Sequence, residues 1–373
     1  MLFSVSSFFI TLVMSTALIL LFELFIAQKR LIRFLRMDVV ILLAIVIIIR
    51  LLLPFEYTFT ISIPFPWVMN HLQDFLKFNL FMSFTILNLI CLIWAVGIII
   101  QFIRYMQIIK KCNLIFSILK NRSIHKCVAD YIEVSPKHNY SVCFTEDIES
   151  PMVIGLKKVI FLPQIKLDDF EIQDILKHEM QHIKNHDNLI KQIVNLIKII
   201  YWWFPPIYWF SNKIQLALEM RVDQQITKKY SKTQLFNYTN VLIKLKKYMI
   251  ENSHTISSTL PVSSSFLIGD NKKVLSYRIN YLLNSDYKKN TNWLLLLIIL
   301  LFPFTTNSVV FEAYTPPPID DYTIKSANSV KESFILKHAD GTYSLFVNGK
   351  LKKINDINND LYSNLPIINE TEN

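Results

Sequence analysis

Two histidines and a glutamate within one short segment have the side chains needed for metal-dependent hydrolysis. The segment K-H-E-M-Q-H-I-K-N-H-D runs from Lys177 to Asp187 and places His178 and His182 four residues apart. On a helix such residues project from one face about one turn apart, so two imidazoles can bind one zinc ion. Glu179 can then take a proton from an activated water and pass it to a leaving amine. This H-E-x-x-H spacing predicts a zinc peptidase site.

A third ligand must come from elsewhere, because catalytic zinc takes three protein ligands and keeps one position open. The segment L-E-M-R-V-D-Q-Q-I begins at Leu218 and places Glu219 and Asp223 one helical turn apart. We expect Glu219 to be the third ligand. Asp223 is expected to accept the second N–H of a ligand histidine, most readily His178. The alternative is a surface helix on which both acids are solvated.

His186 is the rival for the third ligand, since it continues the four-residue series. On a straight helix it lies about 80° around the axis from His178, so all three histidines would not point at one ion. We therefore expect His186 to be solvated or to cap a helix.

The apolar stretch Ile193–Phe210 must bring the two ligand segments together. Hydropathy alone would make it a membrane span, but a crossing would place Glu219 on the opposite face from His182. Pro205 and Pro206 interrupt a helix here, so we expect two helices folded back on each other. Its aromatic side chains are expected either at the membrane interface or in a buried core: Tyr201, Trp202, Trp203, Tyr208 and Trp209.

The first ligand helix must also end or bend before this hairpin. His182 lies 23 residues before Pro205, whereas Glu219 lies only 13 after Pro206, so two straight helices would not bring the ligands level. Asn185, Asp187 and Asn188 are the candidates for the break, because Asn and Asp favour caps and turns. Alternatively, Asp187 has a structural role and pairs with a nearby basic side chain.

Short strands and a helix start are predicted before the motif. Val128–Val134, Val142–Thr145 and Val153–Leu162 have strand composition, and a strand such as the last could hold an extended substrate at a sheet edge. The acidic run from Asp168 to Glu171, which follows Pro163, favours a helix N-terminus.

Composition indicates a membrane protein. Of the 373 residues, 52% are hydrophobic and 18% are charged, which is too apolar for an ordinary soluble chain of this length. Four segments approach the roughly 20 apolar residues that a span needs: Phe3–Ala27, Met37–Pro54, Asn79–Ile103 and Trp293–Val310. The first could instead be a signal peptide, but a basic run follows it and no small-residue cleavage site is present.

The distribution of charge predicts the orientation. Residues 104–292 hold 27 Lys or Arg against 16 acidic residues, whereas residues 311–373 hold six Lys against nine acidic residues. Because basic loops stay on the cytoplasmic side, we expect both termini outside. This topology accounts for most of the net charge of +10, and without a nucleic-acid-reading motif no direct nucleic-acid binding is expected. The four cysteines form no C-x-x-C pair and are interpreted as reduced structural thiols.

The predicted fold is a mainly α membrane protein with four transmembrane helices. Residues 1–103 would hold three transmembrane helices, and residues 104–292 a cytoplasmic α+β zinc metallopeptidase domain. Residues 293–310 would form the fourth transmembrane helix, and residues 311–373 a short external tail. That tail contains the turn signal Asp340–Gly341 within Ser333–Val347, which predicts a β-hairpin.

Several blocks of sequence resemble one family, the integral-membrane metallopeptidases of the β-lactam sensor-transducer, or antirepressor, type of Gram-positive bacteria. They are S-P-M-V-I-G-L-K-K-V-I-F-L-P from Ser150, H-E-M-Q-H-I-K-N-H-D from His178, W-W-F-P-P-I-Y-W from Trp202 and L-E-M-R-V-D from Leu218. The resemblance covers roughly residues 1–310. It implies zinc at His178, His182 and Glu219, with Glu179 as the base.

A further block, from Ser263 to Ile279, is similar to the family segment before the last span, where such proteins can cut themselves. Ser265 and Phe266 would flank that bond, although an ordinary polar linker would have a similar composition. Two features depart from the family pattern. The 63 residues after Val310 cannot hold an external penicillin-binding domain, and Arg221 and Val222 stand where the family has Ala and Cys before the acid.

We therefore expect a zinc endopeptidase that regulates by cleaving a cytoplasmic protein such as a transcriptional repressor. One alternative is a membrane quality-control zinc protease. The other is a non-catalytic sensor that binds through its tail or its cytoplasmic sheet. Zn²⁺ is the expected cofactor, the lipid bilayer is an expected partner, and self-association into a homodimer is left open.

Overall fold

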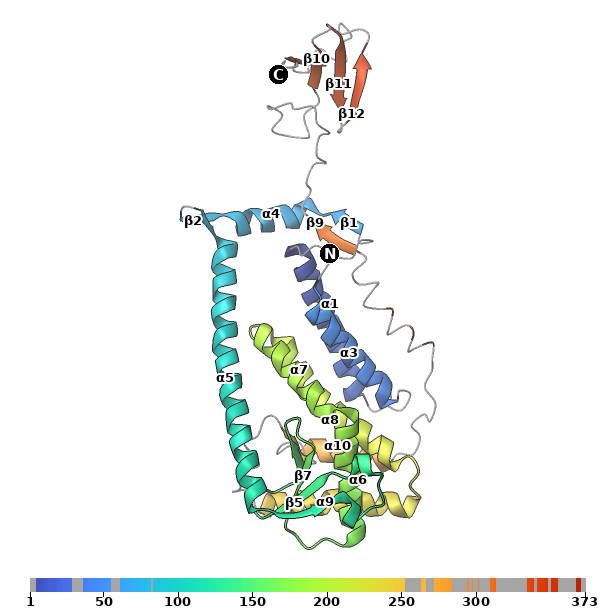
Figure 1. The fold of residues 1–373 in the computed structure, drawn as a ribbon. Coiled ribbons are helices and arrows are strands. Elements are labelled where there is room, and N and C mark those ends of the chain that lie inside the picture. Colours follow the sequence, from blue (N-terminus) through green and yellow to red (C-terminus); the bar gives the residue numbers. More distant parts are fainter. Residues whose placement is uncertain are drawn as a thin grey trace. The chain divides into compact units, whose positions relative to one another are not determined.

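The computed structural model (Figure 1) describes most of the chain up to residue 283 and shorter segments beyond it. The described residues are 5–28, 36–54, 61–81, 83–251, 263–265, 272–283, 294, 297, 301, 309–312, 334–338, 341–347, 350–354 and 367–369. The chain divides into two compact units. One comprises Met1–Ile63 and Asp74–Phe311, and the other comprises Pro64–Gln73 and Glu312–Asn373.

Three apolar helices of the first unit fall on the first three predicted spans: α1 (Val5–Ala27), α3 (Met37–Leu52) and α5 (Ile86–Arg122). Two helices are long and apolar enough to cross a membrane on their own, Ser7–Ala27 and Ile86–Arg122, among the residues that the structure describes. The fourth predicted span, Trp293–Val310, lies mostly outside the described residues. Its last two residues belong to strand β9 (Val309–Glu312), which pairs with β1 (Ile61–Pro64).

Helix α5 begins later than the sequence predicted. Instead of a helix from Asn79, β2 (Asn79–Phe81) pairs with β3 (Phe84–Thr85), and α5 follows at Ile86. The Thr85 hydroxyl accepts a hydrogen bond from the Asn88 amide at 3.3 Å, and this N-cap fixes the start. The helix α4 (Pro66–Lys77) was not predicted. At its other end α5 continues past the predicted span as far as Arg122.

A five-stranded sheet lies in the same unit. Its strands, in spatial order, are β4 (Ile124–Cys127), β5 (Ser141–Thr145), β7 (Val159–Pro163), β6 (Met152–Ile154) and β8 (Ser263–Ser265). Only β5 and β7 run parallel among these pairs of described strands. The strand expected at Val142–Thr145 is confirmed.

Two of the strand predictions are wrong in detail. Val153–Leu162 is two antiparallel strands, because Gly155 takes a positive φ of 62° and starts a turn between β6 and β7. Val128–Val134 is not a strand, since Val128–Asp130 forms a 3₁₀ turn. The Asp130 carboxylate stabilises this turn by accepting the Cys127 amide at 2.8 Å.

Five helices follow in sequence order: α6 (Asp169–Asn185), α7 (Asp187–Ile200), α8 (Pro205–Thr227), α9 (Lys232–Glu251) and α10 (Lys272–Leu283). Helix α6 starts as expected, because Asp168 and Glu171 form a reciprocal capping box. The expected break lies at His186, which takes the left-handed conformation with φ 56° and ψ 35° between α6 and α7. Helices α7 and α8 fold back on each other at Pro205 (Figure 1), so the predicted hairpin is confirmed.

The α7–α8 hairpin packs against α1, α3 and α5. The Tyr201 hydroxyl donates to the Leu51 carbonyl at 2.7 Å, and its ring stacks on Phe8 at 6.2 Å. From α5, the Trp94 indole donates to the Ile200 carbonyl at 2.7 Å. Tyr201 is buried, whereas three other aromatic side chains of the hairpin are exposed: Trp203, Tyr208 and Trp209. The aromatic side chains are thus divided between a helical core and an outer surface.

Gly97 on α5 makes this docking testable, because a Cβ atom there would overlap the indole of Trp202. In an isolated helix, Gly→Ala stabilises by up to about 1 kcal/mol. We expect Gly97→Ala to have the opposite sign here and to lower the free energy of unfolding by about 1–3 kcal/mol. Thermal unfolding in detergent measures the change, with the exposed Ala95→Val as the control. A stabilised Gly97→Ala protein would contradict the packing.

The second unit contains a small sheet of order β12-β11-β10-β13. Its strands are β10 (Phe334–Lys337), β11 (Tyr343–Val347), β12 (Lys350–Ile354) and β13 (Ile367–Asn369). The predicted hairpin is confirmed as β10 and β11, which pair antiparallel. Gly341 supplies the turn with a φ of 79°, whereas Asp340 lies outside the described residues. Phe334, Leu336 and Phe346 form its core.

Candidate metal centre

The residues expected to bind metal meet in the core between α6 and α8. His178 and His182 come from α6 and Glu219 from α8, and all three are at most 2% exposed. One potential ligand atom from each lies within 4.8 Å of the others. The hairpin achieves this because the turn at His186 redirects the chain into α7, so that α8 returns alongside α6.

The distances between these ligand atoms fit a tetrahedrally coordinated metal ion. His178 Nε2 and His182 Nε2 are 3.0 Å apart, and the Glu219 carboxylate lies 3.3 Å from the first and 3.5 Å from the second. Two ligand atoms each about 2 Å from a tetrahedral zinc ion are about 3.3 Å apart. A set of two nitrogens and one oxygen is also a set that zinc takes.

The carboxylates next to the histidines supply a second test of fit. Both oxygens of Glu179 and Oε1 of Glu219 are buried and have no hydrogen-bond partner among the described residues. Burying a carboxylate oxygen without a hydrogen-bond partner costs free energy of folding. A cation bound between the histidines would offset this cost for both Glu179 and Glu219. The residues present therefore fit a divalent metal ion.

His182 is oriented by a carboxylate at the start of α7. Its Nδ1 lies 2.6 Å from the Asp187 carboxylate, which is fully buried and also accepts from the Arg221 guanidinium. Such a contact fixes the tautomer that leaves Nε2 free for a metal. Asp187 was expected as a break or a structural partner, and its contact with His182 was not predicted. Asp187 pairs with the basic side chain of Arg221, one of the two residues that stand where the family has Ala and Cys.

His178 is oriented by a longer chain of contacts. Its Nδ1 lies 2.9 Å from the Tyr238 hydroxyl, which donates to Asp223 at 2.7 Å, and Asp223 itself is 3.3 Å from Nδ1. Asp223 is thus beside His178 as expected, but the nearer partner is Tyr238. Arg278 on α10 donates two hydrogen bonds of 2.8 Å to Asp223 and lies 3.4 Å from Glu219.

The buried charges shift one another's pKa values. Burial alone would raise the pKa of Asp223, but the Arg278 charge and hydrogen bonds outweigh burial and hold that pKa well below its usual value. Burial would lower the pKa of His182, yet Glu219 and Asp187 raise it to about 10. For Glu179 burial dominates and raises the pKa, although His182 and His178 oppose it. A carboxyl with a raised pKa is suited to both accepting and donating a proton.

Sequence reasoning missed two residues of this site, Tyr238 and Arg278. Neither is spaced from the motif in a way that a helix period could detect, because they lie 60 and 100 positions after His178 on separate helices. Of the other predicted positions, His186 forms the turn and is not part of the group of ligand atoms. Ser265 ends strand β8, whereas Phe266 lies outside the described residues.

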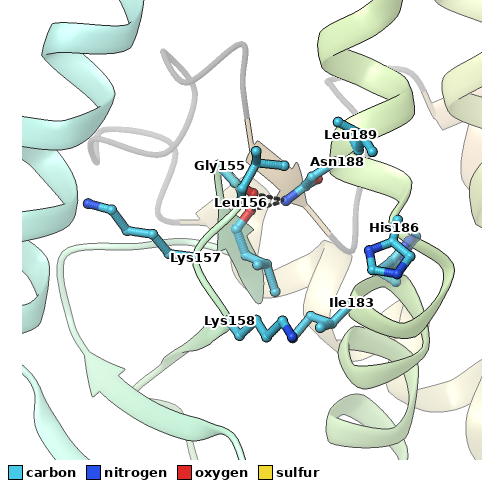
Figure 2. Close-up of a pocket in the computed structure, with 10 residues that line it drawn as sticks. Gly155, Leu156, Lys157, Lys158, Ile183, His186, Asn188 and Leu189 are labelled. Carbon is cyan, nitrogen blue, oxygen red and sulfur yellow. Dashed lines mark hydrogen bonds between the residues drawn. The ribbon is translucent and has the colours of Figure 1, made fainter.

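A pocket opens beside His182 (Figure 2). It is partly open to solvent, has a volume of about 370 Å³, and is lined by the β6–β7 turn and by the junction of α6 and α7. Asn188 holds the two sides together, since its amide donates to the carbonyls of Val153 at 3.1 Å and Gly155 at 2.6 Å. In Figure 2, Lys158 extends toward Ile183, whereas Lys157 points away from it. The pocket leads from the surface to one of the buried histidines.

Replacing Asp187, which is not an expected ligand, tests whether its contact with His182 contributes to zinc affinity. We expect Asp187→Asn to weaken zinc affinity by about 10- to 100-fold, because the amide supports the histidine tautomer less well and leaves Arg221 unpaired. Competition with a fluorescent zinc chelator measures the affinity. Asp174→Asn, on the same helix as the histidines but away from them, is the control. Equal affinities in the two variants would rule out this role.

Comparison with known proteins places the chain in a family. The family model "BlaR1 peptidase M56" matches residues 13–282. The "Methicillin resistance mecR1 protein" of Staphylococcus aureus is 28% identical over 229 residues, 57% of this chain and 37% of that protein. The "Regulatory protein BlaR1" of Bacillus licheniformis is 28% identical over 122 residues, 32% of this chain and 20% of that protein.

The "Regulatory protein BlaR1" of Staphylococcus aureus is 24% identical over 249 residues, 64% of this chain and 40% of that protein. The chain thus spans well under half the length of these curated relatives. The matched range nevertheless contains every residue of the metal centre, from His178 on α6 to Arg278 on α10. Because the family model covers well over half of the sequence, the chain belongs to the BlaR1 peptidase M56 family.

Proposed function

We propose that this chain is a membrane-embedded zinc endopeptidase that acts on a cytoplasmic protein and so transmits a signal. The observation that carries the proposal is the buried group of His178, His182 and Glu219. Beside it lies Glu179, whose carboxylate has no hydrogen-bond partner among the described residues. Zinc, when bound, would polarise the peptide carbonyl and activate water. Family membership supports peptidase chemistry.

The residues around the metal would have separate tasks in such a reaction. Glu179 would take a proton from water and pass it to the leaving amine, and its raised pKa favours this exchange. Asp187 would hold His182, and Tyr238 with Asp223 would hold His178, each through Nδ1. The buried surroundings would exclude bulk water and strengthen these electrostatic interactions.

The substrate would approach along β6 and the pocket next to His182. Strand addition satisfies the backbone of an extended peptide and leaves alternate side chains free for pockets. The pairing of β8 with β6, in which Ser265 lies opposite Met152, supports this interpretation, because a strand of the chain itself occupies the outer edge of β6. The same pairing supports self-cleavage after Ser265, since Ser265 occupies the position where a substrate strand would bind.

The proposed membrane arrangement has four crossings with both termini outside and the metal centre on the cytoplasmic side. The excess of Lys and Arg in residues 104–292 supports this orientation. Pairing of β1 with β9 also supports it, because the segments after the second and fourth spans would then lie on the same face. The names of the relatives, which describe a regulatory protein and a methicillin-resistance protein, favour a regulatory role.

The test is cleavage by the purified chain in detergent, with and without a zinc chelator. The substrates are any repressor protein encoded beside this gene and, for comparison, unfolded casein. We expect zinc-dependent cleavage of the repressor at one bond and no general degradation of casein. Rapid degradation of casein would instead favour a quality-control protease. A zinc-loaded chain that cuts neither substrate nor itself would favour a non-catalytic sensor.

A further inference from the structure

A second cavity, remote from the metal centre, lies between α5 and the α7–α8 hairpin. It is partly open to solvent and has a volume of about 600 Å³. Its polar lining consists of side chains from α5, α7 and α8: Gln101, Arg104, Tyr105, Asn195, Lys198 and Tyr208. Two of these carry positive charge, and neither has a carboxylate within 4.0 Å among the described residues. The cavity is therefore a positively charged site with hydrogen-bonding groups on three helices.

The chemistry of the lining selects an anion with several oxygen atoms. Arg104 on α5 and Lys198 on α7 both line the cavity, so an anion with several oxygen atoms could use both charges. Asn195 and Gln101 add amide N–H donors, and the Tyr208 hydroxyl already donates to the Trp202 carbonyl at 2.8 Å. These groups favour a phosphate over a neutral ligand.

The position of the cavity along α5 favours a lipid phosphate. The apolar part of α5 from Ile86 to Ile103 would be about 27 Å long at about 1.5 Å per residue, close to the hydrocarbon thickness of about 30 Å. Arg104 is the first charged residue of the helix and falls at the end of this stretch, where phospholipid phosphates lie. Lys198, on the apolar hairpin, can reach the same level by extending its flexible side chain.

The exposed side of α5 at this level also suits acyl chains. On α5, Ile99, Ile100, Phe102 and Ile103 are between 46% and 58% exposed. By helix periodicity they lie on the side of α5 turned away from the cavity-lining residues Gln101, Arg104 and Tyr105. They therefore indicate that this turn of α5 meets hydrocarbon, which places lipid phosphates at the level of Arg104 rather than supplying a wall of the cavity.

We propose that this cavity binds the headgroup of an anionic phospholipid from the cytoplasmic leaflet, bridging α5 to α7. The proposal uses the membrane placement proposed above but not the peptidase activity. Helix α7 carries Lys198 in its last turn and Asp187, the partner of His182, as its first residue. The lipid would thus stabilise one end of a helix whose other end orients a ligand of the metal centre.

Lipid binding to the full chain tests the proposal without an activity assay. Delipidated protein in detergent is titrated with phosphatidylglycerol or with phosphatidylcholine of the same acyl chains, and bound lipid is counted by native mass spectrometry. We expect phosphatidylglycerol to bind about tenfold or more tightly than phosphatidylcholine, since each cation near an anionic lipid contributes to the attraction. The double variant Arg104→Gln and Lys198→Gln should lose this preference.

Two further variants test whether a loss of lipid preference depends on these two positions or only on the total charge. Lys110→Gln with Lys111→Gln removes the same charge from exposed positions of α5 outside the cavity, and it should keep the preference. Arg104→Lys with Lys198→Arg keeps the charge and should retain most of it. A preference that survives in the double glutamine variant, or equal binding of both lipids, would overturn the proposal. Displacement of phosphatidylglycerol by millimolar inorganic phosphate would assign the cavity to a soluble anion instead.

Discussion

Glu179→Gln is expected to abolish cleavage while leaving zinc bound. The side chain keeps its size but can no longer accept a proton from water, and loss of such a group slows turnover by about 10²- to 10⁴-fold. Zinc should stay at its wild-type content, because the three ligand atoms and their supporting contacts come from other residues. The stability of the fold should not fall, since the variant removes a buried carboxylate that has no partner among the described residues.

The measurements are the rate of cleavage of repressor and of the Ser265–Phe266 bond, together with zinc content by mass spectrometry. Glu146→Gln, at an exposed position in the same unit, is the matched control and should behave as wild type. Undiminished turnover by zinc-loaded Glu179→Gln would exclude Glu179 as the base. Loss of zinc from this variant would show instead that Glu179 contributes to metal binding.

Glu219→Gln is expected to remove the metal itself. The neutral amide is a weak ligand, and the change leaves the Arg278 guanidinium 3.4 Å from a group that no longer carries negative charge. Loss of a supporting contact alone costs about 10- to 100-fold in metal affinity, so loss of a direct ligand should cost more than about 100-fold. Cleavage should disappear with the zinc.

The zinc content of Glu219→Gln, measured after purification without added metal, should fall close to zero. Glu251→Gln at the exposed end of α9 provides the control. Helical content by circular dichroism should remain, because α8 is held by its contacts with α1 and α3 through the hydrophobic core. A variant that keeps one zinc per chain would mean that the third ligand is not Glu219. Together the two glutamine variants separate proton transfer from metal binding.

Local sequence patterns predicted much of the chemistry correctly. The four-residue spacing of His178 and His182 is a property of any α-helix, so their common face followed from α6 alone. Pro205 predicted the fold-back of the hairpin, because a proline cannot continue the hydrogen bonds of a preceding helix. The acidic run from Asp168 to Glu171 likewise predicted the start of α6, because carboxylates favour the positive end of the helix dipole.

Boundaries were less predictable where two local preferences compete. Val153–Leu162 has strand composition throughout, yet Gly155 turns the chain, which separates β6 from β7 and creates one wall of the pocket. Asn79 begins an apolar run, but pairing of β2 with β3 delays α5 until the Thr85 cap. The break after α6 falls on His186, between the three residues favoured by composition. In each case backbone pairing or a single left-handed residue overrides a general preference.

The sequence by itself determined that two histidines and a glutamate share a helix, that the chain is rich in membrane-type segments, and that an acidic residue on a later helix should complete a zinc site. Only the tertiary structure decided how those ligands are held. Tyr238, Arg278 and the Asp187–Arg221 pair reach the site from separate elements, and the cavity at Arg104 and Lys198 forms between helices almost 100 residues apart in sequence. The physical reason is that helix periodicity acts over a few residues, whereas buried charges and cavities depend on which distant surfaces pack together.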